Sequence, residues 1–152
     1  MSRKYMVSVI GGHECDEKTA HLAEKVGNVI AEQGAVLVCG GLGGVMESVC
    51  KGAKASGGFT VGIIPGDDKS KANEFVDIVI TSDMGYSRNT LVAGTPDMVV
   101  ALSGAYGTLS EISFALISGK DVYGFGTWDI PDVKKLNAPE ELREIIKNNI
   151  KG

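Results

Sequence analysis

The sequence predicts an α/β protein of the Rossmann-like, doubly wound type, with a mostly parallel sheet of six or seven strands and helices on both faces. Strand-like and helix-like segments alternate along the chain, which is typical of βαβ units with right-handed crossovers. Residues 36–38, 61–64 and 98–102 are continuously apolar, as expected of strands that helices cover on both faces. We expect the strand order 3-2-1-4-5-6.

The spacing of apolar residues places the individual elements. Residues 16–33, for example, carry apolar side chains at helical spacing. Asp83 can cap a helix, and Pro139 suits the first turn of the last helix. The predicted strands are residues 4–10, 35–39, 60–64, 76–80, 98–102 and 122–125. The predicted helices are residues 16–33, 44–55, 83–93, 108–118 and 139–149.

Composition limits the class of protein. The chain has 152 residues, 43% hydrophobic and 22% charged, which suits one domain over residues 1–152 with its own core. Fifteen Lys and Arg against nineteen Asp and Glu give a net charge of −4, whereas nucleic-acid binders usually have a basic face. We therefore expect no nucleic-acid polymer as partner. No apolar stretch of about 18 residues and no signal-peptide pattern occur, so we expect a cytoplasmic protein without membrane contact.

The cysteines and histidines form no metal-binding pattern. Cys15, Cys39 and Cys50 have no C-x-x-C spacing, and His13 and His21 make no zinc-type array. We therefore expect neither a metal site nor a disulfide framework.

Glycine is the unusual feature of the composition, with 21 of 152 residues, about twice the ordinary share. Glycine-rich turns follow three predicted strands, and the carboxyl ends of parallel strands form the ligand crevice of open α/β sheets. Such turns let the backbone approach a ligand, and helix N-termini favour anions, although a short turn can also need glycine only to reverse direction. We expect a small phosphorylated ligand to contact the residues of these turns: Gly11, Gly12, His13, Gly40, Gly41, Gly43, Gly44, Ser103, Gly104, Tyr106, Gly107 and Thr108.

Common cofactor motifs do not fit these turns. A dinucleotide fingerprint needs a third glycine, which the segment around Gly41 lacks, and an acidic residue where the second strand ends in Cys39. A P-loop is excluded because Phe114 stands where Gly119-Lys120 would require glycine. No lysine has the surroundings of a pyridoxal-phosphate Schiff base, so a lysine decarboxylase is not expected.

Several motifs together resemble a known family: Gly40-Gly-Leu-Gly-Gly-Val-Met46, Gly62-Ile-Ile-Pro65, Arg88-Asn89 and Gly104-Ala-Tyr-Gly-Thr-Leu-Ser-Glu111. They resemble the "lysine decarboxylase-like" superfamily, which contains the LOG cytokinin-activating phosphoribohydrolases and the molybdenum cofactor carrier proteins. The resemblance covers nearly the whole chain. It implies a Rossmann-like fold, a homo-oligomer such as a dimer or tetramer, and a nucleotide-sized phosphorylated ligand, with Met46 and Asn89 among its contacts.

The chain departs from the LOG pattern Pro-Gly-Gly-x-Gly-Thr-x-x-Glu at two positions, which hold Ser103 and Ala105. Asn89 also replaces the lysine of the LOG Arg-Lys pair. Arg88 and Glu111 match the catalytic Arg and Glu of the family. The departures put hydrolase activity in doubt, and the segment 84–89 is more similar to the carrier branch.

Two functions follow from this resemblance. We expect a carrier-type protein that binds a nucleotide-like or pterin-like phosphorylated molecule, such as the molybdenum cofactor, and requires no cofactor of its own. The alternative is a phosphoribohydrolase that cleaves the N-glycosidic bond of a nucleoside 5′-monophosphate, with Arg88 and Glu111 as catalytic residues.

Local alternatives remain open at several of these residues. Thr108 to Glu111 also matches a helix capping box. Arg88, placed in the middle of the predicted helix, could face solvent. Helix 84–93 and the segment near Trp128 are expected to form a two-fold interface.

Overall fold

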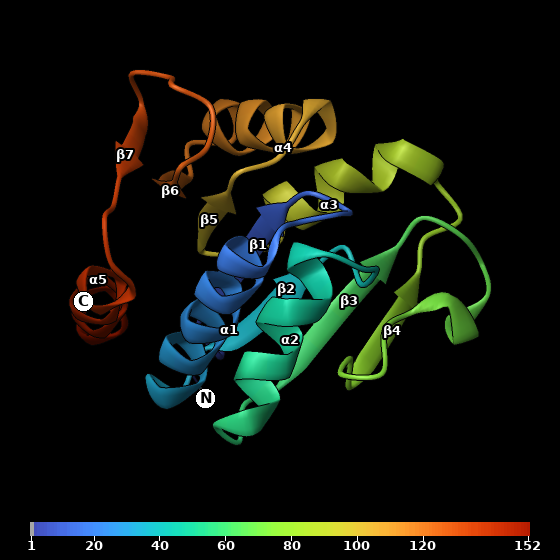
Figure 1. Ribbon diagram of the computed structural model, residues 1–152, viewed down its shortest axis with the longest axis horizontal. Helices are drawn as coiled ribbons and strands as arrows, with labels where there is room; N and C mark the ends of the chain where they lie inside the picture. The colour runs from blue at the N-terminus through green and yellow to red at the C-terminus, as the bar shows by residue number, and fades with distance from the viewer. Residues whose placement is uncertain (1) are drawn as a thin grey trace.

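The computed structural model describes residues 2–152, in which seven parallel strands form one sheet in the order β4-β3-β2-β1-β5-β6-β7 (Figure 1). The strands are β1 (Met6–Gly11), β2 (Val36–Cys39), β3 (Thr60–Ile64), β4 (Ile78–Thr81), β5 (Met98–Leu102), β6 (Asp121–Phe125) and β7 (Val133–Lys135). The α-helices are α1 (Glu17–Glu32), α2 (Val45–Ala55), α3 (Asn89–Gly94), α4 (Tyr106–Ile117) and α5 (Pro139–Lys151). Two short 3-10 turns are η1 (Lys69–Lys71) and η2 (Gly85–Arg88).

The predicted fold class is confirmed, but the predicted strand order is wrong for one strand. β4 pairs with β3 at the outer edge of the sheet, and β5 takes the expected place of β4 beside β1. The connection between β3 and β4 contains η1 but no α-helix. Asp77 fixes β4 beside the start of β3, because its carboxylate accepts from the Thr60 backbone N–H at 2.9 Å.

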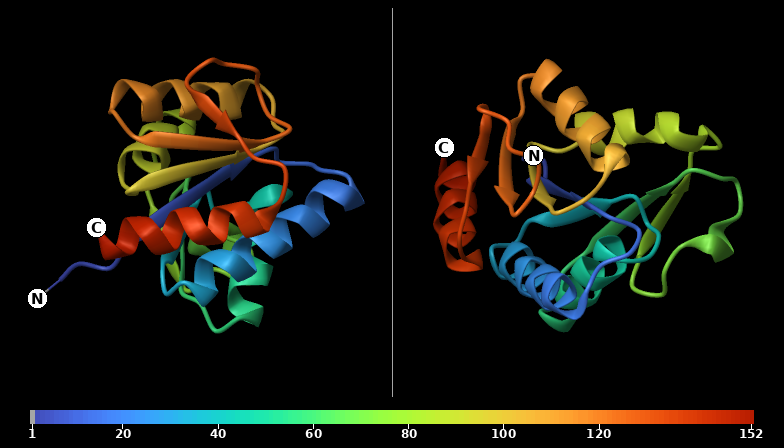
Figure 2. Two further views of the ribbon diagram at one scale, coloured as in Figure 1. Left: turned by 90° about the vertical axis from the view of Figure 1, so that its left-hand side faces the viewer. Right: turned by 45° about the horizontal axis from the view of Figure 1, so that its top comes forward.

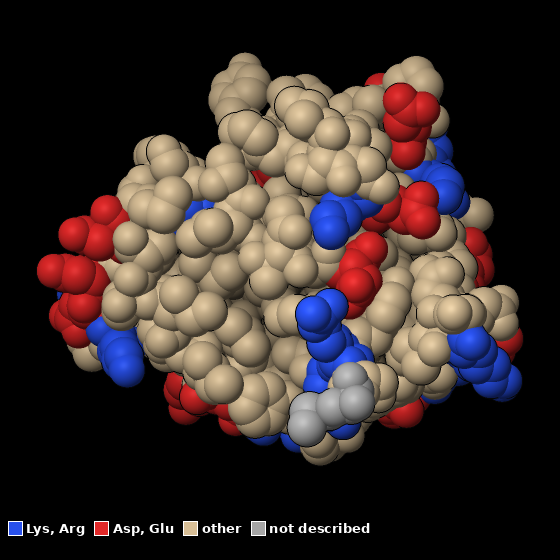
Figure 3. All heavy atoms as spheres, turned by 180° about the vertical axis from the view of Figure 1, so that it is seen from behind, with Lys and Arg blue, Asp and Glu red and all other residues tan. Residues whose placement is uncertain are grey.

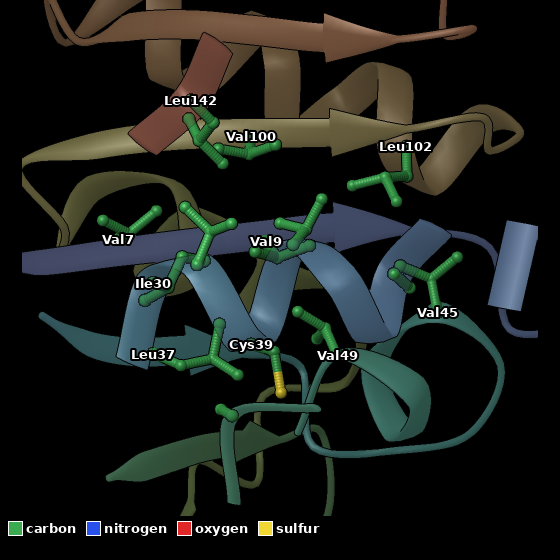
Figure 4. Packing of buried hydrophobic residues seen from close by; sticks show 14 of the residues in the cluster. Val7, Val9, Ile30, Leu37, Cys39, Val45, Val49, Val100, Leu102 and Leu142 are labelled. Carbon is green, nitrogen blue, oxygen red and sulfur yellow. The ribbon is translucent and has the colours of Figure 1, made fainter. Parts of the chain in front are cut away.

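The helices cover both faces of the sheet, as predicted (Figure 2). Helices α1, α2 and α5 pack on one face, where their buried side chains meet those of β1, β2 and β5 (Figure 4). Helices α3 and α4 pack on the other face against a second cluster of buried residues. Neighbouring residues of β1 alternate between the two clusters, with Val9 in the first and Ile10 in the second. The central strands β1, β2, β3 and β5 are therefore buried on both faces, which explains their continuous apolar sequence.

One face of the molecule shows a mixed charge distribution (Figure 3). On the face seen in Figure 3, the Lys and Arg side chains of the described residues lie among Asp and Glu side chains rather than in one basic area. Within residues 2–152, no helix is both long enough and apolar enough to cross a membrane.

Part of the high glycine content serves the contact between α1 and α2. A Cβ on Gly27 of α1 would lie 2.1 Å from the carbonyl oxygen of Val49, and one on Gly52 of α2 would lie 2.0 Å from that of Glu24. Backbone therefore contacts backbone at both positions, and no side chain fits at either of them. These two glycines are required for the packing of α1 against α2, and neither of them belongs to a turn.

We predict that Gly52→Ala lowers the free energy of unfolding by about 2 kcal/mol, because the added methyl group overlaps the Glu24 carbonyl. Helix propensity alone would change stability by about 1 kcal/mol in the opposite direction. The measurement is urea unfolding followed by circular dichroism. Gly94→Ala is the matched control, since a Cβ there has no heavy atom within 4 Å. Equal stability of the Gly52→Ala protein and the wild type would contradict the close contact.

Candidate functional site

A cavity of 390 Å³ lies at the carboxyl ends of the central strands, within the size range of small-molecule sites. It is bounded by the turns that follow β1, β2, β3 and β5, by η2, and by the first turns of α2 and α4. The lining residues are Val9, Ile10, Gly11, Gly12, His13, Gly40, Leu42, Met46, Pro65, Gly85, Tyr86, Arg88, Ala105, Gly107, Thr108 and Glu111.

The structure brings many of the predicted site residues together in this cavity. Those that line it are Gly11, Gly12, His13, Gly40, Met46, Arg88, Gly107, Thr108 and Glu111. Gly104 instead lines an adjoining hollow, which shares Gly12, His13 and Ala105 with the cavity. Outside the lining of both lie Gly41, Gly43, Gly44, Asn89, Ser103 and Tyr106.

Sequence reasoning missed the apolar part of the lining. Val9 and Ile10 lie near the end of β1, Leu42 lies inside the second glycine turn, and Pro65 directly follows β3. Their position at or just after the ends of strands is the feature of the sequence that could have identified them as lining residues. Gly85 and Tyr86 precede Arg88 in η2, and their proximity in sequence to Arg88 could have identified them. The cavity therefore combines a polar glycine wall with an apolar wall.

Gly44 shapes the cavity without lining it. Its φ is +61°, and a Cβ would lie 2.3 Å from the carbonyl oxygens of both Gly12 and His13. The Val45 N–H at the start of α2 donates to the Gly12 carbonyl at 3.0 Å. The turns after β1 and β2 are thus packed backbone against backbone, which only glycine permits. At this position the need of the backbone for glycine explains the residue.

Helix α4 begins earlier than the sequence predicts, at Tyr106 rather than Thr108. Its N-cap is Ala105, which offers no side-chain hydrogen bond, so the capping box suggested by Thr108 and Glu111 does not form. Thr108 packs instead against Gly104, where a Cβ would lie 2.1 Å from the Thr108 Oγ1. Glu111 is consequently free to face the cavity, which it lines.

The segment before α4 has an unusual backbone. Ser103 has a φ of +45° and Gly104 a φ of +97°. Proline is confined to a φ near −65°, so it cannot occupy position 103 in this conformation. The departure from the LOG pattern at Ser103 is therefore a difference in the path of the backbone, in addition to a difference in side chain.

Arg88 is buried, with 7% of its surface exposed, and lies in η2 rather than on a solvated helix face. Its Nε donates to the carbonyl of Ile63 at 2.9 Å and its Nη2 to that of Gly40 at 3.4 Å. Its Nη1 donates to the Asn89 side chain, whose Nδ2 donates onward to Ser110 Oγ at 3.2 Å. Arg88 thus joins the ends of β2 and β3, and Asn89 links it to α4 rather than lining the cavity.

Glu111 is also 7% exposed and lies close enough to Arg88 for their charges to interact. Within residues 2–152 the two side chains do not form a salt bridge. Burial raises the pKa of the Glu111 carboxyl from 4.5 to about 8, and the positive charge of Arg88 only partly opposes this rise. At neutral pH most Glu111 side chains are therefore uncharged and can donate a hydrogen bond.

Two buried thiols lie next to the second glycine turn, and one of them accepts a hydrogen bond from it. Cys39 and Cys50 are buried, with their sulfur atoms 3.5 Å apart, and the Gly41 N–H donates to Cys39 Sγ at 3.3 Å. The hydrogen bond between the two thiols lowers the pKa of Cys39, and the same bond and burial raise the pKa of Cys50. Among the described residues, no group of three or more His, Cys, Asp or Glu side chains could hold a metal ion.

Comparison with known proteins gives a consistent result over the whole chain. A family model described as "LDcluster4: SLOG cluster4 family" matches residues 4–150. The solved structure of the molybdenum cofactor binding protein from Rippkaea orientalis matches with a TM-score of 0.91, 32% identity and coverage of 99% of each chain. The molybdenum cofactor carrier protein MCP from Chlamydomonas reinhardtii matches with a TM-score of 0.88 and 29% identity, over 99% of this chain and 100% of that one.

A relative with an enzymatic name matches over a smaller share of its length. The cytokinin riboside 5′-monophosphate phosphoribohydrolase of Mycobacterium tuberculosis is 37% identical over 116 residues, which are 74% of this chain and 59% of that protein. The resemblance to LOG proteins and cofactor carriers that the motifs predict is confirmed.

We predict that Glu111 makes stability decrease with rising pH. Its carboxyl stays protonated in the folded protein up to about pH 8, whereas in the unfolded chain it ionises near pH 4.5. Folding therefore takes up a proton between these values, and its contribution to stability, complete below pH 4.5, is lost by at most about 1.4 kcal/mol per pH unit.

The measurement is urea unfolding of the wild type and of Glu111→Gln at several pH values. Gln has no proton to lose, and the other titrating groups are common to both proteins. The free energy of unfolding of Glu111→Gln minus that of the wild type should rise through this pH range and level off above it. A difference that stays constant with pH would show that the carboxyl is ionised in the folded protein.

Proposed function

This chain belongs to the SLOG cluster4 family, and on that premise we propose that it is a carrier-type protein for a phosphorylated small molecule. The ligand would be nucleotide-like or pterin-like, with the molybdenum cofactor as the candidate cargo. The observation that carries the proposal is the similarity over 99% of both chains, at 32% identity, to a protein described as binding the molybdenum cofactor.

The chemistry of the cavity supports an anionic ligand. The first N–H groups of α4 have no partner within the helix, and its N-cap Ala105 supplies no side-chain acceptor for them. Gly107 and Thr108 of this turn line the cavity, so their N–H groups and the positive end of the helix dipole suit a phosphate. Gly107 has no side chain to keep the phosphate away.

Charge in the cavity supports carriage rather than hydrolysis. With Glu111 uncharged near neutral pH, Arg88 contributes a positive charge that no neighbouring carboxylate cancels. A phosphate is attracted to this combination. An enzyme that cleaves a glycosidic bond through a cationic transition state would instead benefit from an ionised carboxylate.

Turnover is the second candidate, because the mycobacterial relative carries the name of a phosphoribohydrolase and both Arg88 and Glu111 line the cavity. The two functions require different results in one experiment. The protein is incubated with molybdenum cofactor released from a molybdoenzyme, and in parallel with a panel of nucleoside 5′-monophosphates.

We expect the carrier to retain molybdenum and pterin through gel filtration and to release no free base from any nucleotide. Elemental analysis and pterin fluorescence measure the first result, and chromatography measures the second. If the wild type releases free base and Glu111→Gln does not, the protein is a hydrolase and the carrier proposal is wrong. Failure to retain the cofactor, together with no turnover, would contradict both functions.

We predict that Gly107→Val weakens binding of the cofactor by about 2 kcal/mol, because the side chain blocks approach to the N–H groups of α4. The fold should persist, since the nearest atom to a Cβ at this position is Asn89 Nδ2 at 3.9 Å. Titration calorimetry and thermal unfolding measure the two effects. Gly94→Val is the control, because position 94 is exposed and does not line the cavity. Unchanged affinity in a folded Gly107→Val protein would show that the phosphate does not bind at the N-terminus of α4.

We further propose that the protein is a homo-oligomer that associates through one apolar surface. Exposed apolar side chains of the described residues gather on η2, α3 and α4: Met84, Tyr86, Leu91, Tyr106, Phe114 and Ile117. Helix α4 is apolar along most of its length, and its apolar side chains are not all buried: Ile117 is 81% exposed. Exposed apolar side chains on neighbouring elements are typical of subunit interfaces.

We predict that the wild type sediments as a dimer or larger assembly at micromolar concentration and that Ile117→Lys sediments as a folded monomer. The lysine would place a charge in the proposed interface, where it has no partner. Ile150→Lys is the control, because Ile150 is an exposed apolar residue of α5 on the other face of the sheet. A monomeric wild type would contradict the proposed assembly.

A further inference from the structure

We propose that Thr127 and Trp128, in the loop between β6 and β7, are positioning residues for the cavity. Their side chains fix the backbone of residues 103–105 and, through it, the start of α4, where the phosphate is proposed to lie. The inference rests on the proposed function for the ligand alone, since the hydrogen bonds that carry it lie within the protein.

The two side chains hold both ends of the 103–105 segment. Thr127 Oγ1 donates to the Ser103 carbonyl at 2.7 Å, and Trp128 Nε1 donates to the Ala105 carbonyl at 3.0 Å. The Ser103 N–H donates in turn to the carbonyl of Phe125, at the end of β6, at 3.2 Å. The segment is therefore held at three points, one on β6 and two on the loop that follows it.

The segment needs this support at its two ends, because Gly104 suits its own positive φ but Ser103 and Ala105 do not favour theirs. Ser103 has a φ of +45°, which a residue with a side chain rarely adopts. Ala105 caps α4 without a side-chain hydrogen bond. Ser103 without these bonds would return to a negative φ, and the N–H groups of Gly107 and Thr108 would turn with it.

The loop that supplies the two side chains is itself anchored. Trp128 and Ile130 pack against the buried cluster beneath α3 and α4. The methyl group of Thr127 lies against Gly124 of β6, where a Cβ would be only 2.6 Å from it. Thr127 and Trp128 can therefore transmit the position of the sheet to the segment.

Trp128 also contacts the helix that the segment leads into. Its ring stacks on that of Tyr106, the first residue of α4, with ring centres 6.1 Å apart and planes inclined by 29°. Tyr106, which the sequence predicts to contact the ligand, lies outside the lining of the cavity. The stack adds an aromatic contact to the hydrogen bond at Ala105.

The test compares the wild type with Thr127→Val, which keeps the shape of the side chain and removes its hydroxyl, and Thr127→Ser, which keeps the hydroxyl. The probe is inorganic phosphate, followed in ¹H–¹⁵N spectra of the whole chain. We expect Thr127→Val to shift the amide signals of Gly104 and Gly107 in the free protein and to weaken phosphate binding by about fivefold. Thr127→Ser should restore both.

Ser113→Ala is the control for loss of a hydroxyl that bonds to a backbone carbonyl, since Ser113 Oγ donates to Leu109 at 3.0 Å within α4. It should leave phosphate affinity unchanged. If Thr127→Val does not fold, Trp128→Phe provides the same comparison, because it keeps an aromatic ring against Tyr106 and removes the N–H donor.

Unmoved signals of Gly104 and Gly107 in Thr127→Val would overturn the inference. Moved signals with unchanged phosphate affinity would overturn it as well, because the segment would then not govern the site. If phosphate binds to neither protein, the proposed anion site fails, while the amide signals of the free proteins still decide whether Thr127 fixes the segment.

Discussion

The geometry of the site depends on the hydrogen bonds of the buried Arg88 guanidinium. Its bonds to the carbonyls of Gly40 and Ile63 join the ends of two neighbouring strands, and its bond to Asn89 connects them with α4. A buried charge is stable only when its donors find partners, and here backbone carbonyls provide most of them. Because those partners are neutral, the positive charge remains effective inside the cavity.

The electrostatics of the cavity follow from this arrangement. Arg88 contributes a positive charge and the N-terminus of α4 a positive dipole end, while burial keeps Glu111 uncharged near neutral pH. An anion entering the cavity meets no negative charge from Glu111. The two side chains that match the catalytic Arg and Glu of the LOG pattern can therefore also suit retention of a phosphorylated ligand, depending on the ionisation of Glu111.

The sequence allowed the location of the site to be predicted, because the carboxyl ends of parallel strands must meet at one edge of the sheet. It could not separate the roles of the glycines. Gly107 lines the cavity, whereas Gly44 permits contact between two turns and Gly52 permits contact between two helices. These distinctions depend on which backbones meet in space. The spacing of apolar residues also predicts an α-helix around Arg88, because local spacing does not reveal the 3-10 turn that buries this side chain.

The left-handed backbone at Ser103 has a consequence for how this loop can change over evolutionary time. Exchanging Ser103 for the proline of the LOG pattern would require a different φ, a different path for Gly104 and new partners for Thr127 and Trp128. Proline alone at position 103 therefore cannot preserve this loop, because the hydrogen bonds of Thr127 and Trp128 are made to a backbone that proline does not allow.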